Sequence, residues 1–284
     1  IVAVDSITGE VGSAGASCVD LFQTSFSQDG FLGQLIPAIG AINTQAYYIP
    51  ANQTNATDRM NLGETPSQII SWLVANDVQS LPQLRQYGIA AMINSSPQTA
   101  AHTGSSTDNY KNHITGPNYS IQGNILLSQE VLDSMESRFL NEPGDLTCKL
   151  MAALQGANVI GADTRCNSNG TSSLFAFVKV AQPTDNFGEP SFNISVRTTN
   201  NSGIEPIDSL QTKFNMIHSC SGLDLKETKN FKDFFSIYPN PSSDFIIIEN
   251  KTEENYDLFL YDINKNLILN ESIYGNKKIN ISKY

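Results

Sequence analysis

Short apolar runs with the two-residue period of β-strands alternate along this chain with longer stretches that have the 3.6-residue period of helices. At the start, residues 1–4 and 11–17 flank a turn at Thr8-Gly9 and predict a β-hairpin. The second of these strands, VGSAGAS, has small residues at every other position, which lets another layer or a ligand approach its backbone. A further strand is predicted within residues 31–45, ending at the polar Thr44-Gln45.

Helix signals come next. Thr65-Pro66-Ser67-Gln68 has the spacing of a capping box with proline in the first turn, and it predicts a helix. The Ser80-Leu81-Pro82-Gln83 segment predicts a second helix start, with Gly88 as its stop. The remaining elements are predicted as a hairpin (89–94 and 98–102), a strand (119–127), helices from Ser128 and from Pro143, two strands (173–181 and 191–199) and a final helix (204–217).

Strands occur in clusters that helices separate, which is typical of a layered α+β fold and differs from the strict alternation of a doubly wound sheet. We predict a first domain over residues 1–218 and a polar linker over 219–233. Residues 234–284 read as short strands with turns, which predicts a small all-β sandwich module.

Polar residues concentrate between His102 and Leu126, at the ends of the apolar runs 89–93 and 125–127. Polar groups at strand ends on a rigid sheet are where binding and catalytic sites are usually built. We therefore take this stretch as the centre of a candidate site.

Composition excludes some classes of partner. The 284 residues are 40% hydrophobic, enough for a sizeable core, but only 16% charged, with a formal net charge of −11. This acidic balance argues against nucleic acid or an anionic membrane as partner. No apolar run is long enough to span a bilayer. The chain opens directly in a strand-like run without Met or a signal peptide, so we expect that a leader has been removed or that the sequence is a fragment.

The familiar cofactor and nucleophile motifs are missing. The three histidines have neither HExxH nor HxH spacing, which argues against a zinc site. The segment GANVIGAD lacks the glycine spacing of a dinucleotide-binding fingerprint. No GxSxG nucleophile elbow is present, which argues against an α/β-hydrolase. We expect no metal and no cofactor. The four cysteines lack metal-ligand spacing, and in an exported protein they would form disulfides whose pairing the sequence leaves open: Cys18, Cys148, Cys166 and Cys220.

Three groups of side chains carry candidate chemistry. His102 lies near Ser105 and Ser106, which permits a Ser-His arrangement with Asp108 or Asp163 as orienter, although a histidine that caps a strand end is the simpler interpretation. Asp163 and Arg165 in GADTRC form either a buried ion pair or a substrate clamp. Gln122 and Asn124 share one strand face and either donate to a substrate carbonyl or oxyanion or satisfy neighbouring backbone groups.

Five segments, read in order, resemble the bacterial and archaeal family known as domain of unknown function 1028. They are IVAVDSITGEVGSAGAS, GAINTQA, AAHTG, YSIQGNILLSQEVLDSM and GADTR. The resemblance covers about residues 1–215. It implies the four-layer αββα sandwich of the N-terminal-nucleophile (Ntn) hydrolases. Some relatives carry a peptidoglycan-binding module, which implies an amide or peptide substrate derived from the cell wall.

The segment FSIYPNPSSDFIIIE, followed by LYDINKNLI and INIS, resembles the C-terminal sorting domain of the type IX (Por) secretion system of Bacteroidota. That resemblance implies export across the outer membrane, followed by release or surface attachment. It also implies that the type IX machinery is a partner. The segment stops before the last strands expected of such a domain.

Two departures from the first family bear on mechanism. An Ntn hydrolase uses a Thr, Ser or Cys at its mature N-terminus, with the α-amino group as general base, whereas Ile1 has no nucleophilic atom. We therefore expect the nucleophile upstream of Ile1. Family members also often have a Cys and a Trp after the HTG motif, where this chain has Ser105, Ser106 and Tyr110.

The leading hypothesis is hydrolysis of a small amide or peptide by such a nucleophile, with no nucleic-acid partner and with homo-oligomerisation left open. The alternatives are a non-catalytic ligand-binding domain and a serine hydrolase that uses Ser105 or Ser106 with His102. The expected catalytic residues are His102, Asn124 and Asp163. The expected substrate-binding residues are Asp5, Ser17, Thr44, Gln45, Thr103, Tyr119, Gln122 and Arg165.

Overall fold

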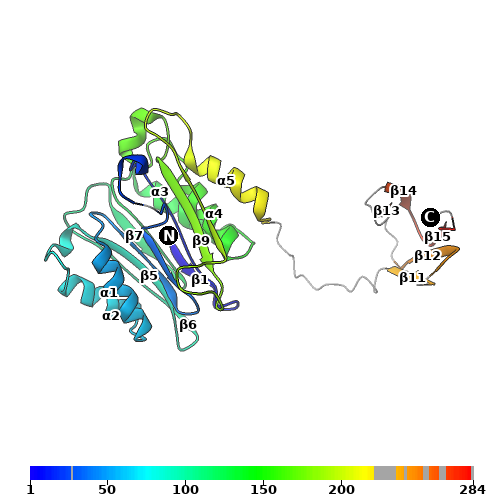
Figure 1. The fold of residues 1–284 in the computed structure, drawn as a ribbon, viewed down its shortest axis with the longest axis horizontal. Coiled ribbons are helices and arrows are strands. Elements are labelled where there is room, and N and C mark those ends of the chain that lie inside the picture. Colours follow the sequence, from blue (N-terminus) through cyan, green and yellow to red (C-terminus); the bar gives the residue numbers. More distant parts are fainter. Residues whose placement is uncertain (27, 221–234, 240–241, 252–255, 262–266, 283–284) are drawn as a thin grey trace. The chain divides into compact units, whose positions relative to one another are not determined.

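The computed structural model describes residues 1–26, 28–220, 235–239, 242–251, 256–261 and 267–282. The chain forms two compact units, Ile1–Gly222 and Leu223–Tyr284 (Figure 1). Most of the predicted linker, residues 221–233, lies outside the described residues. No helix in the described ranges is long and apolar enough to cross a membrane.

The first unit contains a six-stranded antiparallel sheet, called sheet A, with the strand order β10-β9-β2-β1-β8-β7. The predicted N-terminal hairpin is confirmed, because Val2 pairs with Ser13 and Val4 with Val11. The strands of sheet A are β1 Val2–Val4, β2 Val11–Ser17, β7 Asn112–Thr115, β8 Tyr119–Gly123, β9 Phe175–Ala181 and β10 Phe192–Arg197. The hairpin therefore occupies the centre of this sheet.

A second, four-stranded antiparallel sheet, sheet B, has the order β3-β4-β5-β6, with β3 Gly33–Ile36, β4 Gly40–Gln45, β5 Gln86–Ile93 and β6 Ser96–Thr103. The single strand predicted within 31–45 is wrong: a turn at 37–39, with Ala38 at φ 62°, splits it into β3 and β4. The predicted β5–β6 hairpin is confirmed. It closes through Asn94 and Ser95, both at positive φ.

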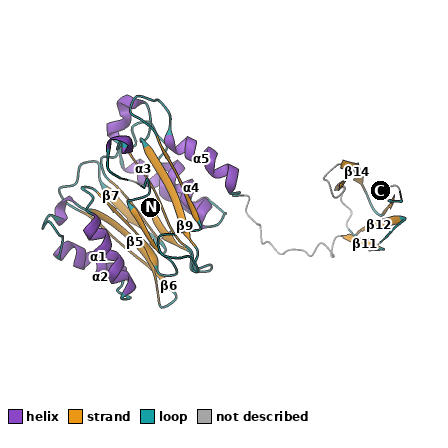
Figure 2. Cartoon of the chain, viewed as in Figure 1, coloured by secondary structure: helices purple, strands orange, loops and turns teal. Residues whose placement is uncertain are grey.

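Helices cover the outer face of each sheet (Figure 2). Two of them, α1 Pro50–Asn61 and α2 Pro66–Ala75, pack on sheet B. The other three, α3 Gln129–Asn141, α4 Leu146–Gly156 and α5 Pro206–Ile217, pack on sheet A. The two sheets contact each other through β1, β2, β7, β8 and β9 of sheet A and all four strands of sheet B. The layers therefore run helix, sheet, sheet, helix.

Small residues on β2 permit this close layering. A Cβ added at Gly12 would lie 2.4 Å from Cδ1 of Leu150 on α4. On the other side, a Cβ added at Gly33 of β3 would lie 2.2 Å from Oγ of Ser13. Both distances are far below van der Waals contact, so neither position has room for a larger side chain. The expectation that VGSAGAS lets another layer approach is confirmed.

A helix prediction is confirmed where the residues that cap the helix are close together in the sequence. Thr65 and Gln68 form both hydrogen bonds of the predicted capping box at the start of α2. The helix expected from Ser80 to Gly88 is wrong, because Pro82–Leu84 makes one 3₁₀ turn and β5 begins at Gln86. Helix α4 begins at Leu146 with Asp145 as its cap, three residues later than expected from Pro143.

Helix α1 has no counterpart among the predictions. Its buried face contains Asn52, Gln53 and Thr57 beside Ala56 and Met60. Mostly polar residues therefore occupy positions that packing usually gives to apolar ones, and the helical period of hydrophobicity is weak. Burial of these polar groups is tolerated because each is hydrogen-bonded. Gln53 Nε2, for example, donates to the carbonyl oxygens of Phe31 and Leu32.

The described residues of the second unit form strands and turns, as predicted. The sheet β11-β12-β15 comprises Phe235–Tyr238, Phe245–Asn250 and Lys277–Asn280. The pair β13-β14 comprises Tyr256–Tyr261 and Leu267–Ile273. Its buried core centres on Ile248, Ile273 and Ile279.

Candidate functional site

A cavity of about 710 Å³ in the first unit collects most of the polar residues predicted for the site. Both sheets line it, together with Val131, Leu132 and Met135 of α3 and Leu154 of α4. The predicted site residues among its lining are Ser17, Gln45, Gln122, Asn124, Asp163 and Arg165. They come from the ends of β2, β4 and β8 and from the start of the 3₁₀ helix Thr164–Asn169, of which Asp163 is the cap. Strand ends thus converge on one cavity.

Side-chain amides form the polar wall. Gln45 Nε2 donates to Gln86 Oε1 at 2.8 Å, and Gln122 Nε2 lies 3.5 Å from Gln45 Oε1. The long second contact leaves the Gln122 amide able to donate to another acceptor. Asn124, just beyond the end of β8, lines the same cavity, and its side chain has no hydrogen-bond partner among the described residues.

Gln86 supports this wall, although the sequence interpretation placed it in a helix. It is fully buried, and its Nε2 donates to Thr103 Oγ1 and to the carbonyl oxygens of Asn112 and Gly123. Its Oε1 then orients Gln45. The signal that could have identified Gln86 is its polarity at the start of an apolar strand, which the expected helix concealed.

The Asp163–Arg165 pair forms the opposite, charged wall. Arg165 donates to both carboxylate oxygens of Asp163, from Nε at 2.9 Å and from Nη2 at 2.6 Å, and Nη2 also contacts Ser17 Oγ at 3.0 Å. Hydrogen bonding to Asp163 raises the pKa of the Arg165 guanidinium further. The Arg165 side chain is 43% exposed, so it remains accessible to a ligand.

Two links hold this pair against β2. The backbone N–H of Cys18 donates to Asp163 Oδ2 at 2.9 Å, and Cys18 is bonded to Cys166. The second disulfide joins Cys148 and Cys220. The expectation of disulfides is confirmed, and the structure supplies the pairing. Because the chain distance from Cys18 to Cys166 is 148 residues, no local pattern could have indicated it.

Ile1, at the start of the central strand β1, also lines the cavity. Its nitrogen is buried and donates to the carbonyl oxygen of Ala14 at 3.0 Å. Its carbonyl oxygen accepts from Asn43 Nδ2 at 3.2 Å, and Asn43 Oδ1 accepts from Ser13 Oγ.

Aromatic rings form a third side of the cavity. Phe26 stacks on Phe31 with 4.0 Å between ring centroids, and both rings meet Tyr48 edge-on. Phe31 also contacts Phe175 of β9 at 6.0 Å. The cavity thus has an apolar part beside its amide and charged parts.

His102 and Thr103 lie on β6, outside the cavity lining. His102 Nε2 lies 3.0 Å from the carbonyl oxygen of Pro82, so Nε2 carries the proton and donates. No hydrogen bond joins His102 to Ser105 or Ser106 among the described residues, and this geometry lends no support to a Ser-His pair. Thr103 contacts the cavity indirectly, because its Oγ1 accepts from Gln86.

Three other predicted residues also lie outside the lining. Asp5 is at the opposite end of β1 from Ile1, where its carboxylate accepts the backbone N–H groups of Ile7 and Thr8. Thr44 is buried beneath the cavity and accepts from Gln53. Tyr119 packs toward the helices and donates to Glu136 Oε1 at 2.6 Å; burial, reinforced by Glu136, raises its pKa to about 12.

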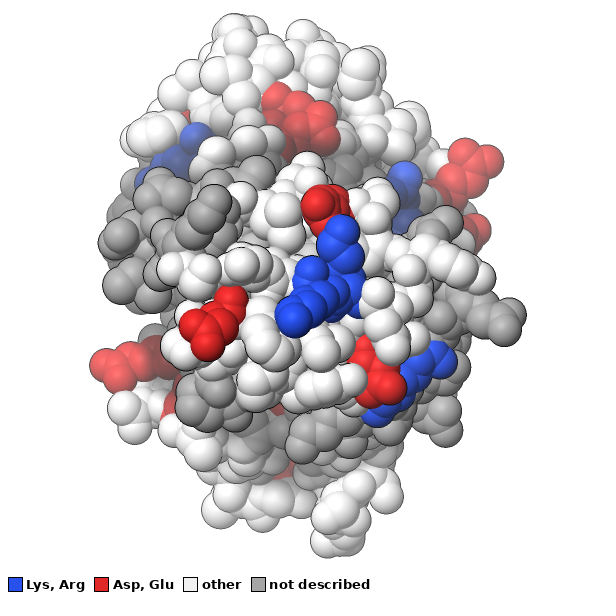
Figure 3. Space-filling model, turned by 90° about the vertical axis from the view of Figure 1, so that its right-hand side faces the viewer, with Lys and Arg blue, Asp and Glu red and all other residues white. Residues whose placement is uncertain are grey.

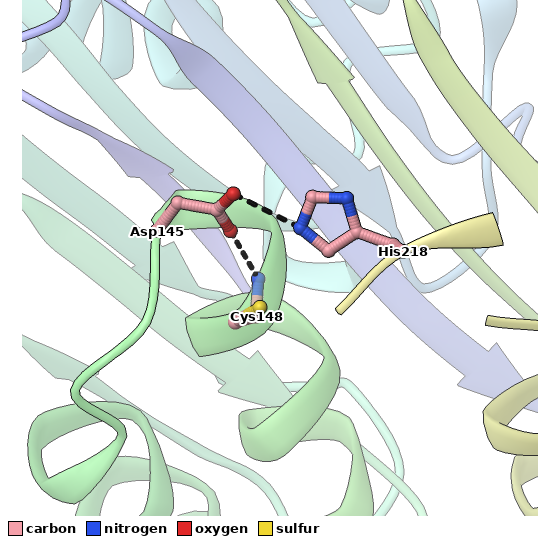
Figure 4. Close-up of side chains that lie close together, drawn as sticks. All are labelled: Asp145, Cys148 and His218. Atoms are coloured by element: carbon pink, nitrogen blue, oxygen red, sulfur yellow. Dashed lines mark hydrogen bonds and ion pairs between the residues drawn. The ribbon is translucent and has the colours of Figure 1, made fainter. Parts of the chain in front are cut away.

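One cluster of possible metal ligands occurs in the described part of the chain, away from the cavity. It consists of Asp145, Cys148 and His218 (Figure 4). The donor set does not fit a metal, because Cys148 is in a disulfide and cannot supply a thiolate. Asp145 caps α4 through the Cys148 N–H, and its other oxygen pairs with His218 Nε2 at 2.9 Å. This cluster therefore serves to hold the end of α5 against α4.

Charged side chains on the face shown in Figure 3 lie scattered in small groups, with Lys and Arg close to Asp and Glu.

Fold and site together define a class: a mixed helix-and-sheet domain with an amide- and ion-pair-lined cavity at its strand ends, followed by a separate small β unit. A family model narrows this class. The family of unknown function DUF1028 matches residues 1–203, and the chain belongs to this family. The C-terminal sorting domain of a secretion system matches residues 236–284. The protein is therefore a substrate of the type IX machinery, which exports it to the cell surface or outside.

A solved structure supports the fold. The crystal structure of a DUF1028 protein from Silicibacter pomeroyi aligns with a TM-score of 0.58 and 21% identity, covering 76% of this chain and 86% of the other. Among curated proteins, none matches this chain.

Proposed function

We propose that the first unit is an Ntn hydrolase that cleaves an amide or peptide bond, with its nucleophile on a residue that precedes Ile1. One observation carries the proposal: Ile1 begins the central strand of sheet A and lines the cavity that also contains the amide wall and the Asp163–Arg165 pair. A residue joined to the nitrogen of Ile1 would thus enter that cavity. The helix, sheet, sheet, helix layering supports the assignment.

The chemistry follows from the residues around this position. The hydroxyl or thiol of the preceding residue attacks the carbonyl carbon of the substrate while its own α-amino group takes the proton. The tetrahedral oxyanion then accepts hydrogen bonds from the amides of Gln122 and Asn124. The proton passes to the departing amine, and water hydrolyses the acyl-enzyme. Asp163 and Arg165 orient the substrate, and the aromatic side of the cavity receives its apolar part.

The identity of the residue at the mature N-terminus tests this proposal. We expect mass spectrometry of the protein recovered from its host to show Thr, Ser or Cys directly before Ile1, or a few residues before it, with a free amine. Substituting that residue with alanine should abolish hydrolysis of the peptides and acyl amides that the natural protein cleaves. An N-terminus without a nucleophile, or with a blocked amine, would refute self-based catalysis and favour the alternative, a non-catalytic ligand-binding domain.

Gln122→Leu is expected to lower kcat by roughly 100- to 1,000-fold, the cost of one oxyanion donor, with a much smaller change in KM. Steady-state kinetics on a cleaved substrate measure this. The matched control is Gln98→Leu, the same substitution at an exposed position on β6, which should leave both constants within about twofold. Equal kinetics for the Gln122 variant and the natural protein would remove Gln122 from the mechanism.

A further inference from the structure

A second cavity, of about 390 Å³, lies on the other side of the aromatic cluster. Phe26, Phe31 and Tyr48 line both cavities, so these three rings form the partition between them. The rest of the second lining comes from the segment around Gly30, from β3 and Pro37, from Gln53 of α1, from β9 and from the segment 186–193. None of the predicted site residues lines this cavity.

Lys179 projects into the second cavity from β9. Its Nζ donates to the carbonyl oxygen of Gly30 at 3.0 Å and lies 5.9 Å from the centre of the Phe177 ring. Burial lowers the pKa of this amine to about 8. The Gly30 carbonyl is the one hydrogen-bond acceptor of Nζ within the described residues, so the charged form lacks a strong stabilising partner.

Three arginines of the first unit differ from Lys179 in having a carboxylate partner. Arg85 pairs with Asp77, Arg165 with Asp163 and Arg197 with Asp29. Within the described ranges, Lys179 has no carboxylate at ion-pair distance. Because desolvating a charge is costly, buried cations in proteins normally have a counter-ion. Lys179 is thus a cation that faces a cavity and has no carboxylate counter-ion within the described ranges.

We propose that the second cavity is a binding site for a small carboxylate-bearing ligand, whose carboxylate pairs with Lys179 Nζ. Two of the three ammonium N–H groups remain after the bond to Gly30 and can donate to both carboxylate oxygens. The neutral amides of Gln28 and Asn193, which line the same cavity, are placed for the polar body of the ligand. The lining contains one cationic side chain and no arginine, so it offers a point charge for one carboxylate group and lacks the fork of donors that arginine presents to phosphate. This proposal is independent of catalysis in the first cavity.

Calorimetric titration of the full chain with succinate at constant ionic strength tests the proposal, with inorganic phosphate as the anion of different chemistry. We expect saturable succinate binding that Lys179→Met weakens at least about 10-fold, the effect of a lost charge-assisted hydrogen bond. Lys213→Met is the matched control. Lys213, exposed on α5, also donates to a backbone carbonyl, that of Ser195, and its loss should change the affinity less than about twofold.

Absence of succinate binding, or equal affinity in the Lys179 variant, would overturn the proposal. Tighter binding of phosphate than of succinate would overturn the carboxylate assignment. A second measurement needs no variant: saturating succinate should raise the pKa read from the ¹³Cε resonance of the lysine that titrates near pH 8. An unchanged pKa at saturation contradicts the pairing.

Discussion

Replacing Asp77 with alanine is expected to lower the free energy of unfolding of the first unit by about 3–5 kcal/mol, because it leaves the Arg85 charge buried without a partner. The side chains of Arg85 and Asp77 are 2% and 0% exposed. Arg85 donates to both Asp77 oxygens, and its Nη1 donates to the carbonyl oxygen of Tyr47 at 2.6 Å. The pair therefore also anchors a segment that lines the larger cavity.

Urea denaturation followed by the fluorescence of Trp72, the only tryptophan, measures this effect in the full chain and reports on the first unit. Glu64→Ala is the control. It removes the partner of Arg59 from an ion pair whose side chains are 24% and 27% exposed, and it should cost under about 1 kcal/mol. The double variant Asp77→Leu/Arg85→Met should be more stable than Asp77→Ala, since no unpaired charge remains. If Asp77→Ala cost no more than Glu64→Ala, the proposed role of the pair would be wrong.

The same pair predicts a pH dependence. Burial alone would raise the pKa of Asp77, but hydrogen bonds from Arg85, Leu81, Asn52 and Gln79 outweigh burial and hold it well below 3.8. Below about pH 4, the unfolded chain therefore binds a proton at Asp77 that the folded chain does not. The stability that Asp77 contributes is fully present at neutral pH and is lost as the pH falls from 4 toward the folded pKa. The stability of Asp77→Ala should thus decline less steeply over that range.

Removing the Cys18–Cys166 disulfide by alanine substitution is expected to cost roughly 3–5 kcal/mol. For a loop of 148 residues, the chain-entropy model gives about 5 kcal/mol as its upper value. In a domain of this size, the melting temperature should fall by roughly 10 °C. The loss should also affect the site, because Cys18 holds Asp163 through its backbone N–H and Cys166 lies next to Arg165. Thermal unfolding measures the loss of stability. Ligand binding in the larger cavity measures the effect on the site.

Cys148→Ala/Cys220→Ala provides the matched control, since it opens a loop of 72 residues that lies away from the cavity. Its cost by the same model is about 4.4 kcal/mol, so both double variants should lose similar stability. Only the Cys18/Cys166 variant should weaken binding at the Asp163–Arg165 wall. Equal effects of both variants on binding would show that the first disulfide has no particular role at the site.

Local signals explain the successful predictions. The N-terminal hairpin has a turn and two-residue periodicity within 17 residues, and the start of α2 has a complete capping box. The strands of the sorting domain are marked in the same way. Where local and tertiary preferences disagree, the prediction fails: the segment before Gln86 has a helix-start pattern, yet β5 is extended because it pairs with β4 and β6.

The sequence by itself determined the mixed helix-and-sheet class and the export signal. It also indicated disulfides, given an exported protein, and several polar residues of the candidate site. Only the tertiary structure decided which strand ends meet, which cysteines pair and that Gln86 supports Gln45. It also decided that the buried Arg85 has a carboxylate partner while Lys179, within the described residues, has none. The physical reason is the range of the interactions. Hydrophobic period and capping depend on residues a few positions apart. The partner of a buried charge, amide or thiol is instead set by packing between segments separated by tens to more than a hundred residues.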